Sequence, residues 1–185
     1  TSTRFPGKVM RVLEGRTVLE WMIRLSQRIE GLDVVCVATP EGAVHDPVVH
    51  EAQRHGAVVV RGSETDVLGR FHAAANIIGA DEIMRVTTDC PFADPQVCGA
   101  VLAHFRKEQA DYGNNNEPFT FPHGLDCEVF TRESLERAAR EASLPYDREH
   151  VTPWMKREKS LKRTYVHGPG GAGPSTPPTL PPPRR

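Results

Sequence analysis

Two patterns of apolar residues alternate along most of this sequence. Short continuous apolar runs are typical of buried strands and predict strands over residues 33–39, 57–60, 81–87, 110–113 and 125–130. Apolar residues three or four positions apart predict helices over residues 17–30, 46–55, 63–78, 131–142 and 148–159, and a further helix that starts at residue 94. Strands that alternate with helices indicate an α/β fold with a mostly parallel sheet and helices on both faces.

Residues that favour helix starts support this pattern. Thr17 and Glu20 have the spacing of a capping box, and Asp46–Pro47 places a proline at the first helical position after an acidic cap. In sheets of this kind, ligands bind at the carboxyl ends of the strands. We therefore expect the functional site in the loops that follow the strands.

The composition changes abruptly after residue 166. Residues 167–185 hold seven of the sixteen prolines and four glycines, so this segment cannot bury apolar area. The sequence predicts one domain over residues 1–166 and a disordered tail over residues 167–185. A P-x-x-P ligand segment is the alternative interpretation of the tail.

The overall composition excludes several classes of partner. The chain has 185 residues, of which 38% are hydrophobic and 25% charged, and its net charge is −1. This charge gives no reason to expect a nucleic acid or an anionic membrane. The four cysteines form no C-x-x-C pair, which predicts free thiols, and no signal peptide is visible. We expect a cytoplasmic protein.

The first eight residues form a loop that suits a polyphosphate. Ser2 and Thr3 offer hydroxyls, Arg4 a planar guanidinium and Lys8 a point charge, while Gly7 lets the backbone approach a ligand closely. A basic surface turn is the alternative, because such turns are common. The chain opens on this loop without a strand before it, although a phosphate loop normally follows the central first strand. We therefore expect a fragment that lacks this strand.

A single acidic residue follows the predicted strand 81–87. A carboxylate at a strand's carboxyl end, here Asp89 with Pro91 after it, is one way to hold Mg²⁺ on the phosphates of a nucleotide. The equal alternative is that Asp89 caps the next turn.

The segment 61–71 enters a helix through a glycine. Its backbone N–H groups, together with Thr39 and Arg61 at strand ends, are expected to face a nucleotide. The alternative is a capped helix with Asp66 and Arg70 as a surface ion pair four residues apart. That alternative accounts for the charges but not for the positions of Arg61 and Gly62.

Three polar residues lead into or lie on the predicted strand 125–130. Asp126 and Glu128 are two residues apart on one face of the strand, close to His123. Such paired acids suit a sugar hydroxyl or a metal, and an exposed sheet face is the alternative. Residues 148–150 begin a helix with three polar groups in a row, which is unusual for a pure scaffold.

Five of these segments, in this order and spacing, closely resemble the cytidylyltransferase-like family. The branch is that of spore coat polysaccharide biosynthesis protein F, related to acylneuraminate and 3-deoxy-manno-octulosonate cytidylyltransferases. The resemblance covers residues 1–158 and is carried by residues 2–8, 61–71, 87–91, 124–130 and 148–153.

This resemblance implies a nucleotidyltransferase fold of the GT-A type, CTP as the donor and Mg²⁺ as the cofactor. It implies transfer of CMP to a sugar or sugar acid, with release of pyrophosphate, in polysaccharide or glycoconjugate precursor synthesis. Two alternatives are a glycosyltransferase that uses a nucleotide-sugar and a non-catalytic nucleotide-binding remnant. The family's first strand and C-terminal third are absent from this sequence, so we expect truncation at both ends, and a homodimer only of the full-length parent.

The resemblance also implies a role for each site residue. Lys8 and Asp89 would be catalytic, and Asp89 would be the metal ligand. The nucleotide would contact Ser2, Thr3, Arg4, Gly7, Lys8, Thr39, Arg61, Asp66 and Arg70. The acceptor would contact His123, Asp126 and Glu128.

Overall fold

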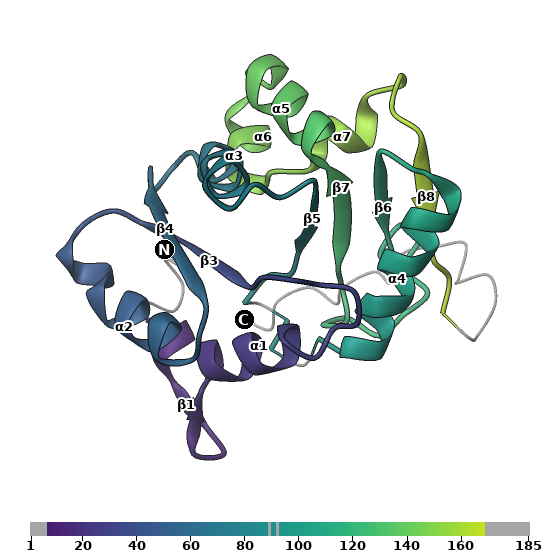
Figure 1. The fold of residues 1–185 in the computed structure, drawn as a ribbon. Coiled ribbons are helices and arrows are strands. Elements are labelled where there is room, and N and C mark those ends of the chain that lie inside the picture. The colour runs from purple at the N-terminus through teal and green to yellow at the C-terminus, as the bar shows by residue number, and fades with distance from the viewer. Residues whose placement is uncertain (1–6, 89, 92, 169–185) are drawn as a thin grey trace, which may run out of the picture.

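The computed structural model describes residues 7–88, 90–91 and 93–168 (Figure 1). Its α-helices are α1 (Val18–Ser26), α2 (Asp46–Arg54), α3 (Val67–Ile78), α4 (Pro95–Glu108), α5 (Arg132–Glu141), α6 (Pro145–His150) and α7 (Pro153–Arg157). Its strands are β1 (Val12–Leu13), β2 (Arg16–Thr17), β3 (Cys36–Pro40), β4 (Val58–Gly62), β5 (Glu82–Arg85), β6 (Tyr112–Asn114), β7 (Glu128–Thr131) and β8 (Arg163–Tyr165). Two 3₁₀ turns, Lys8–Met10 and Ala43–His45, complete the elements.

The α/β class is confirmed, but the sheet arrangement is mixed rather than mostly parallel. β3 and β4 form a parallel pair, and the larger sheet has the order β5-β7-β6-β8. In it, β7 runs antiparallel to both neighbours, whereas β6 and β8 are parallel. Residues 115–127, between β6 and β7, contain no helix, and a parallel connection usually needs one.

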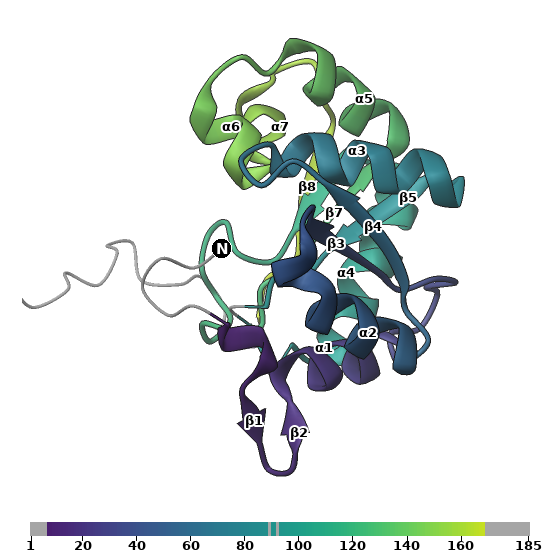
Figure 2. The ribbon, with the colours of Figure 1, turned by 90° about the vertical axis from the view of Figure 1, so that its left-hand side faces the viewer.

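The expected placement of helices on both faces is confirmed around β7. Phe130 packs into a cluster with helices α3, α5 and α7, whereas the preceding Val129 packs with α1 and α4 (Figure 2). Successive strand residues point to opposite faces, so β7 has a helical layer on each side. A third cluster lies between α1, α2 and the β3–β4 pair.

The structure departs from the sequence pattern in three segments. The helix expected over 148–159 is two short helices, because Val151 takes a left-handed φ of 73° between them and Pro153 begins α7. The sequence pattern also missed β8 and the hairpin β1–β2. In that hairpin, Glu14 (φ 49°) and Gly15 (φ 78°) form a tight two-residue turn.

Within the described ranges, no helix is both long enough and apolar enough to cross a membrane.

Candidate functional site

The parallel strands β3 and β4 end side by side. Thr39 is in register with Arg61 and Pro40 with Gly62, and the N–H of Glu41 donates to the carbonyl of Gly62 (2.9 Å). The structure therefore brings together Thr39 and Arg61, as the sequence predicts. Thr39 is buried, with 4% of its surface exposed. A ligand at this sheet edge would therefore contact the backbone near Thr39 rather than its side chain.

The Arg61 side chain folds back onto the loop that follows β3. One guanidinium nitrogen forms an ion pair with Asp46 at the start of α2, and another donates to the carbonyl of Gly42 (3.1 Å). The N-cap position of α2 is occupied by His45, and Asp46 is the first residue of the helix. Asp46 thus holds Arg61 instead of capping the helix.

Gly62 is required by the close approach of Arg70. A Cβ at position 62 would lie 2.8 Å from Cγ of Arg70, closer than real Cβ contacts allow. The Arg70 guanidinium is largely buried and donates to the carbonyls of Ser63 and Glu64. Burial lowers the pKa of Arg70, partly offset by Asp66 and Glu64. Arg70 therefore closes the loop between β4 and α3, which gives the glycine a structural reason.

α3 is a capped helix, as the alternative interpretation expected, but Asp66 itself is the cap rather than a residue on the helix surface. Oδ1 of Asp66 accepts from the N–H of Gly69 (2.9 Å), but Oδ2 pairs with Arg148 of α6 rather than with Arg70. Burial acts to raise the pKa of Asp66, but the Arg148 and Gly69 hydrogen bonds outweigh it, and the net pKa is lowered. The unusual polar run at 148–150 marked Arg148 as a residue of interest, but it did not indicate Asp66 as its partner.

Glu128 lies at the centre of a buried network and is 3% exposed. Its Oε1 accepts hydrogen bonds from Tyr112 (2.7 Å) and Thr152 (2.9 Å) and lies 3.1 Å from Nζ of Lys156. Its Oε2 accepts from Arg85, the residue opposite it on β5 (2.6 Å). Burial acts to raise the pKa of Glu128, but Lys156, Arg85 and Tyr112 hold it below the usual range.

Asp126 has a different environment from Glu128. Its Oδ2 lies 3.7 Å from Sγ of Cys90 and 3.4 Å from the N–H of Gly124, and no described residue forms an ion pair with it. β7 begins at Glu128, so Asp126 precedes the strand and the two acids contact different groups. Asp126 therefore remains a ligand candidate, whereas the oxygens of Glu128 are occupied.

A buried asparagine fixes the segment that carries Asp126. Asn115 donates to the carbonyl of Leu125 (2.8 Å) and accepts from the N–H of Cys127 (2.9 Å). The polar run at 114–116 was the available sequence signal for this clamp.

His123 is exposed, and its ring centroid lies 5.1 Å from that of the exposed Phe119.

Part of the predicted site lies outside the described residues, namely Ser2, Thr3, Arg4 and Asp89. Gly7 adopts a left-handed φ of 69° and precedes the 3₁₀ turn that begins at Lys8. Among the described residues, no atom lies within 4 Å of a Cβ built at position 7, so the visible requirement for glycine is this backbone angle. Val9 and Met10 pack beside β3, where the loop ends.

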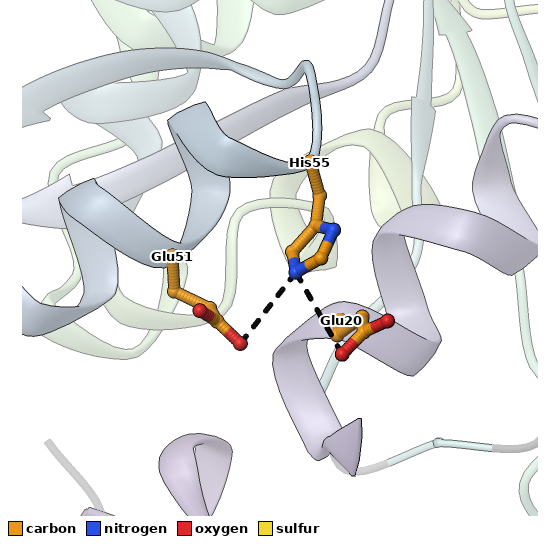
Figure 3. A group of neighbouring side chains, drawn as sticks. All are labelled: Glu20, Glu51 and His55. Carbon is orange, nitrogen blue, oxygen red and sulfur yellow. Dashed lines mark ion pairs between the residues drawn. The ribbon is translucent and has the colours of Figure 1, made fainter.

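A further acidic group joins α1 to α2, away from the strand ends. The His55 ring lies between Glu20 and Glu51, with Nε2 3.7 Å from each carboxylate (Figure 3). Their possible ligand atoms lie within 4.8 Å of one another. However, Arg16 and Arg24 pair with Glu20, and Arg54 pairs with Glu51. These guanidinium groups oppose a divalent cation, so the group is a charge network that joins two helices.

Comparison with known proteins identifies the family. The sequence model of a family described as Cytidylyltransferase matches residues 1–170. The chain belongs to the cytidylyltransferase family. It is 32% identical to an uncharacterized protein of Methanocaldococcus jannaschii, over 89% of this chain and 66% of that protein. It is 31% identical to the spore coat polysaccharide biosynthesis protein SpsF of Bacillus subtilis, over 88% of this chain and 68% of that protein.

The structure agrees with this membership. A cytidylyltransferase from Leptospira borgpetersenii superposes with a TM-score of 0.86 at 30% identity, over 91% of this chain and 72% of that one. The chain thus has the α/β nucleotidyltransferase fold and spans about two thirds of the length of its first two relatives.

Within this cytidylyltransferase-family chain, the structure locates partners that sequence reasoning missed. Asp46 holds Arg61, and Arg148 holds Asp66, across 15 and 82 positions of sequence. Arg85 and Lys156 approach Glu128 from β5 and α7, across 43 and 28 positions. Local spacing carries no signal for pairs that are so far apart.

Replacing Gly62 with alanine should destabilise the protein. The new Cβ would displace the Arg70 side chain, and such overpacking costs about 1–3 kcal/mol. Urea unfolding measures the change. Gly99→Ala in α4 is the matched control, because its Cβ would meet only contacts of 3.8 Å or more, and alanine favours a helix by about 1 kcal/mol. Equal midpoints for the two variants would contradict this account.

Glu128→Gln should change how stability depends on pH. Because the folded-state pKa of Glu128 is lowered, its stabilisation is present above the unfolded-state value, about 4.3, and is lost as pH falls through the folded-state pKa. We expect the variant to be less stable than the parent at neutral pH, with a gap that narrows in acid. Urea unfolding midpoints, measured from neutral pH down into acid, give the difference in stability between variant and parent. The exposed Glu149→Gln is the control. A gap that stays constant with pH would exclude this role.

Proposed function

We propose that this chain is the nucleotide-binding part of an enzyme that transfers CMP from CTP to a sugar or sugar acid. The observation that carries the proposal is the Cytidylyltransferase match over residues 1–170, which includes every predicted site residue. The name of the B. subtilis relative points to polysaccharide precursor synthesis as the setting. We further propose the GT-A type for the fold and the cytoplasm as the location, in keeping with four free cysteines.

The reaction requires positioning and charge neutralisation rather than a protein nucleophile. An acceptor hydroxyl attacks the α-phosphorus of CTP and gives up its proton. The new P–O bond forms as the bond to pyrophosphate breaks. We assign Ser2, Thr3, Arg4 and Lys8 to the triphosphate, because their hydroxyl and cationic groups match phosphate oxygens.

The remainder of the nucleotide would contact the ends of β3 and β4. The side chains of Arg61, Asp66 and Arg70 are already engaged with protein groups. The loop between β4 and α3 would therefore contact a base or ribose through its backbone groups. This assignment keeps the predicted location while moving the contacts from side chain to main chain.

The residues that contact Cys90, which follows position 89 in sequence, support Mg²⁺ as the proposed cofactor. Thr87 and Asp126 offer hydroxyl and carboxylate oxygens, and both contact Cys90, the neighbour of Asp89. Hard oxygen donors are those that Mg²⁺ prefers. We propose that Asp89 holds the ion, with Asp126 close by, and that the ion neutralises phosphate charge.

On the acceptor side, His123 and Asp126 are the groups that we assign to the sugar. Glu128 would act through its partners, because its carboxylate is saturated by four protein donors. It thus acts as a positioning residue in this proposal. A homodimer of a longer parent stays a prediction.

Lys8→Ala should weaken CTP binding. Loss of a charge-assisted contact costs about 1.5–3 kcal/mol, which corresponds to roughly 10- to 100-fold in affinity. Calorimetry with CTP, UTP, ATP and GTP in the presence of Mg²⁺ should show a preference for CTP that Lys8→Ala reduces. The exposed Lys107→Ala is the control. Equal affinity for all four nucleotides, or no loss in the variant, would refute the assignment.

Asp89→Asn separates a metal ligand from a helix or turn cap. Asparagine caps about as well as aspartate, so a capping role leaves both stability and binding unchanged. A metal role predicts weaker Mg²⁺-dependent CTP binding with an unchanged melting temperature. Titrating Mg²⁺ at fixed CTP in both proteins distinguishes the two roles.

A further inference from the structure

One short segment joins two parts of the candidate site. Arg148 of α6 forms the ion pair with Asp66, the cap of α3, and α6 lies beside α3 (Figures 1 and 2). Thr152, which precedes α7, donates through its hydroxyl to Oε1 of Glu128, the first residue of β7 (2.9 Å). Three residues separate Arg148 from Thr152, so the backbone between them sets where α3 is held relative to β7.

The backbone of this segment is strained at Val151. Its φ of 73° and ψ of −57° are those of a γ-turn that is rare in proteins, because a Cβ is crowded in this conformation. The N–H of Thr152 donates to the carbonyl of His150, two residues earlier, and closes the turn (2.9 Å). Since β-branched residues seldom adopt a positive φ, the surrounding structure must enforce this turn.

Two features of the surroundings hold the turn in place. The side chain of Val151 is fully buried and belongs to the apolar cluster that also includes Leu68 of α3 and Phe130 of β7. Across the turn, both guanidinium NH groups of Arg157 in α7 donate to the buried carboxylate of Asp147 in α6. The N–H of Val151 donates to the carbonyl of the same Asp147 (2.9 Å). The turn is thus fixed by apolar packing and by polar contacts together.

A simple break between two helices would not require this geometry. Pro153 already prevents a continuous helix through this point. A glycine at position 151 would adopt the same φ without a Cβ to crowd the backbone. Strained backbone conformations persist mainly at functional sites, where one particular arrangement is needed. The strain at Val151 therefore indicates a role beyond ending α6.

We propose that Val151 is a positioning residue. Its turn keeps Arg148 and Thr152 at a fixed separation, and so keeps the loop between β4 and α3 in a fixed position relative to the start of β7. The inference rests on the proposed function, in which the first of these contacts the nucleotide and the second borders the acceptor. A displacement of about 1 Å between reacting groups can lower a rate about 100-fold, so this relative position matters for the transfer of CMP.

The first test measures the connection without any ligand. Thr152→Val removes the hydroxyl that donates to Glu128, whereas Thr152→Ser keeps a hydroxyl at this position. The readout is hydrogen exchange at the N–H of Gly69, which Asp66 binds at the other end of the connection. We expect Thr152→Val to speed this exchange at least about threefold relative to the amides of β4, and Thr152→Ser to leave it at the parent rate.

Two further variants show whether the effect passes through the turn. Val151→Gly makes the joint flexible, so in its background Thr152→Val should no longer change exchange at Gly69. Thr164→Val is the matched control, because Thr164 is a buried threonine on β8, outside the connection. It should leave the exchange at Gly69, relative to β4, at the parent rate.

The second test uses CTP with Mg²⁺ as the probe. CTP should slow exchange of the Thr152 N–H at least about threefold in the parent chain, and should not do so in Val151→Gly. Calorimetry on the same samples measures whether CTP binds. Absence of CTP binding by the parent would refute the proposed function, and the ligand-free exchange at Gly69 would still decide the role of Val151.

Three results would overturn the proposal. The first is equal exchange at Gly69 in the parent, Thr152→Val and Thr164→Val. The second is an effect of Thr152→Val that is as large with Gly at position 151 as with Val. The third is CTP binding by the parent that leaves exchange of the Thr152 N–H unchanged. If Val151→Gly does not fold, the comparison of Thr152→Val with Thr152→Ser and Thr164→Val decides the question.

Discussion

One buried carboxylate, that of Glu128, holds together the elements around β7. Glu128 joins β7 to β5 through Arg85, to β6 through Tyr112, and to α7 through Lys156 and the preceding Thr152. An unpaired charge in this position would be strongly destabilising, so the network is stable only with its donors in place. The loop that carries Asp126 leads directly into this strand, and its position therefore depends on the same contacts.

Local features of the fold could be predicted from the sequence, because their causes are local. The Thr17 cap, the Pro95 start of α4 and most apolar periodicities need only neighbouring residues, and the structure has them. The direction of β7 and the existence of β8 could not be predicted in this way. Strand pairing depends on contacts between distant segments, and β8 has only three residues of mixed polarity. The break at Val151 likewise reflects tertiary packing, since that residue is fully buried despite its left-handed backbone.

The candidate site shows the same division between location and partners. The sequence placed Thr39 and Arg61 at one sheet edge correctly, because parallel strands must end together. It could not show that Arg61 turns to Asp46, or that Arg148 reaches Asp66, since these pairs form only after the helices pack. The glycine at position 62 is instructive, because its visible role is to admit the Arg70 side chain. A motif can thus identify a family while the contacts that the structure shows for several of its residues lie within the loop itself.

These engaged side chains limit how a nucleotide could be bound. Arg61 and Arg70 each donate to backbone carbonyls, and the carboxylate of Asp66 both caps α3 and pairs with Arg148. Releasing any of them for a ligand would leave a charged or hydrogen-bonding group without its partner, which costs about 1–3 kcal/mol for each group. A loop held rigidly by its own side chains instead presents backbone groups at fixed positions, at little entropic cost on binding. Rigidity at the ends of β3 and β4 is therefore compatible with recognition of the uncharged part of a nucleotide, whereas the cationic first loop suits the phosphates.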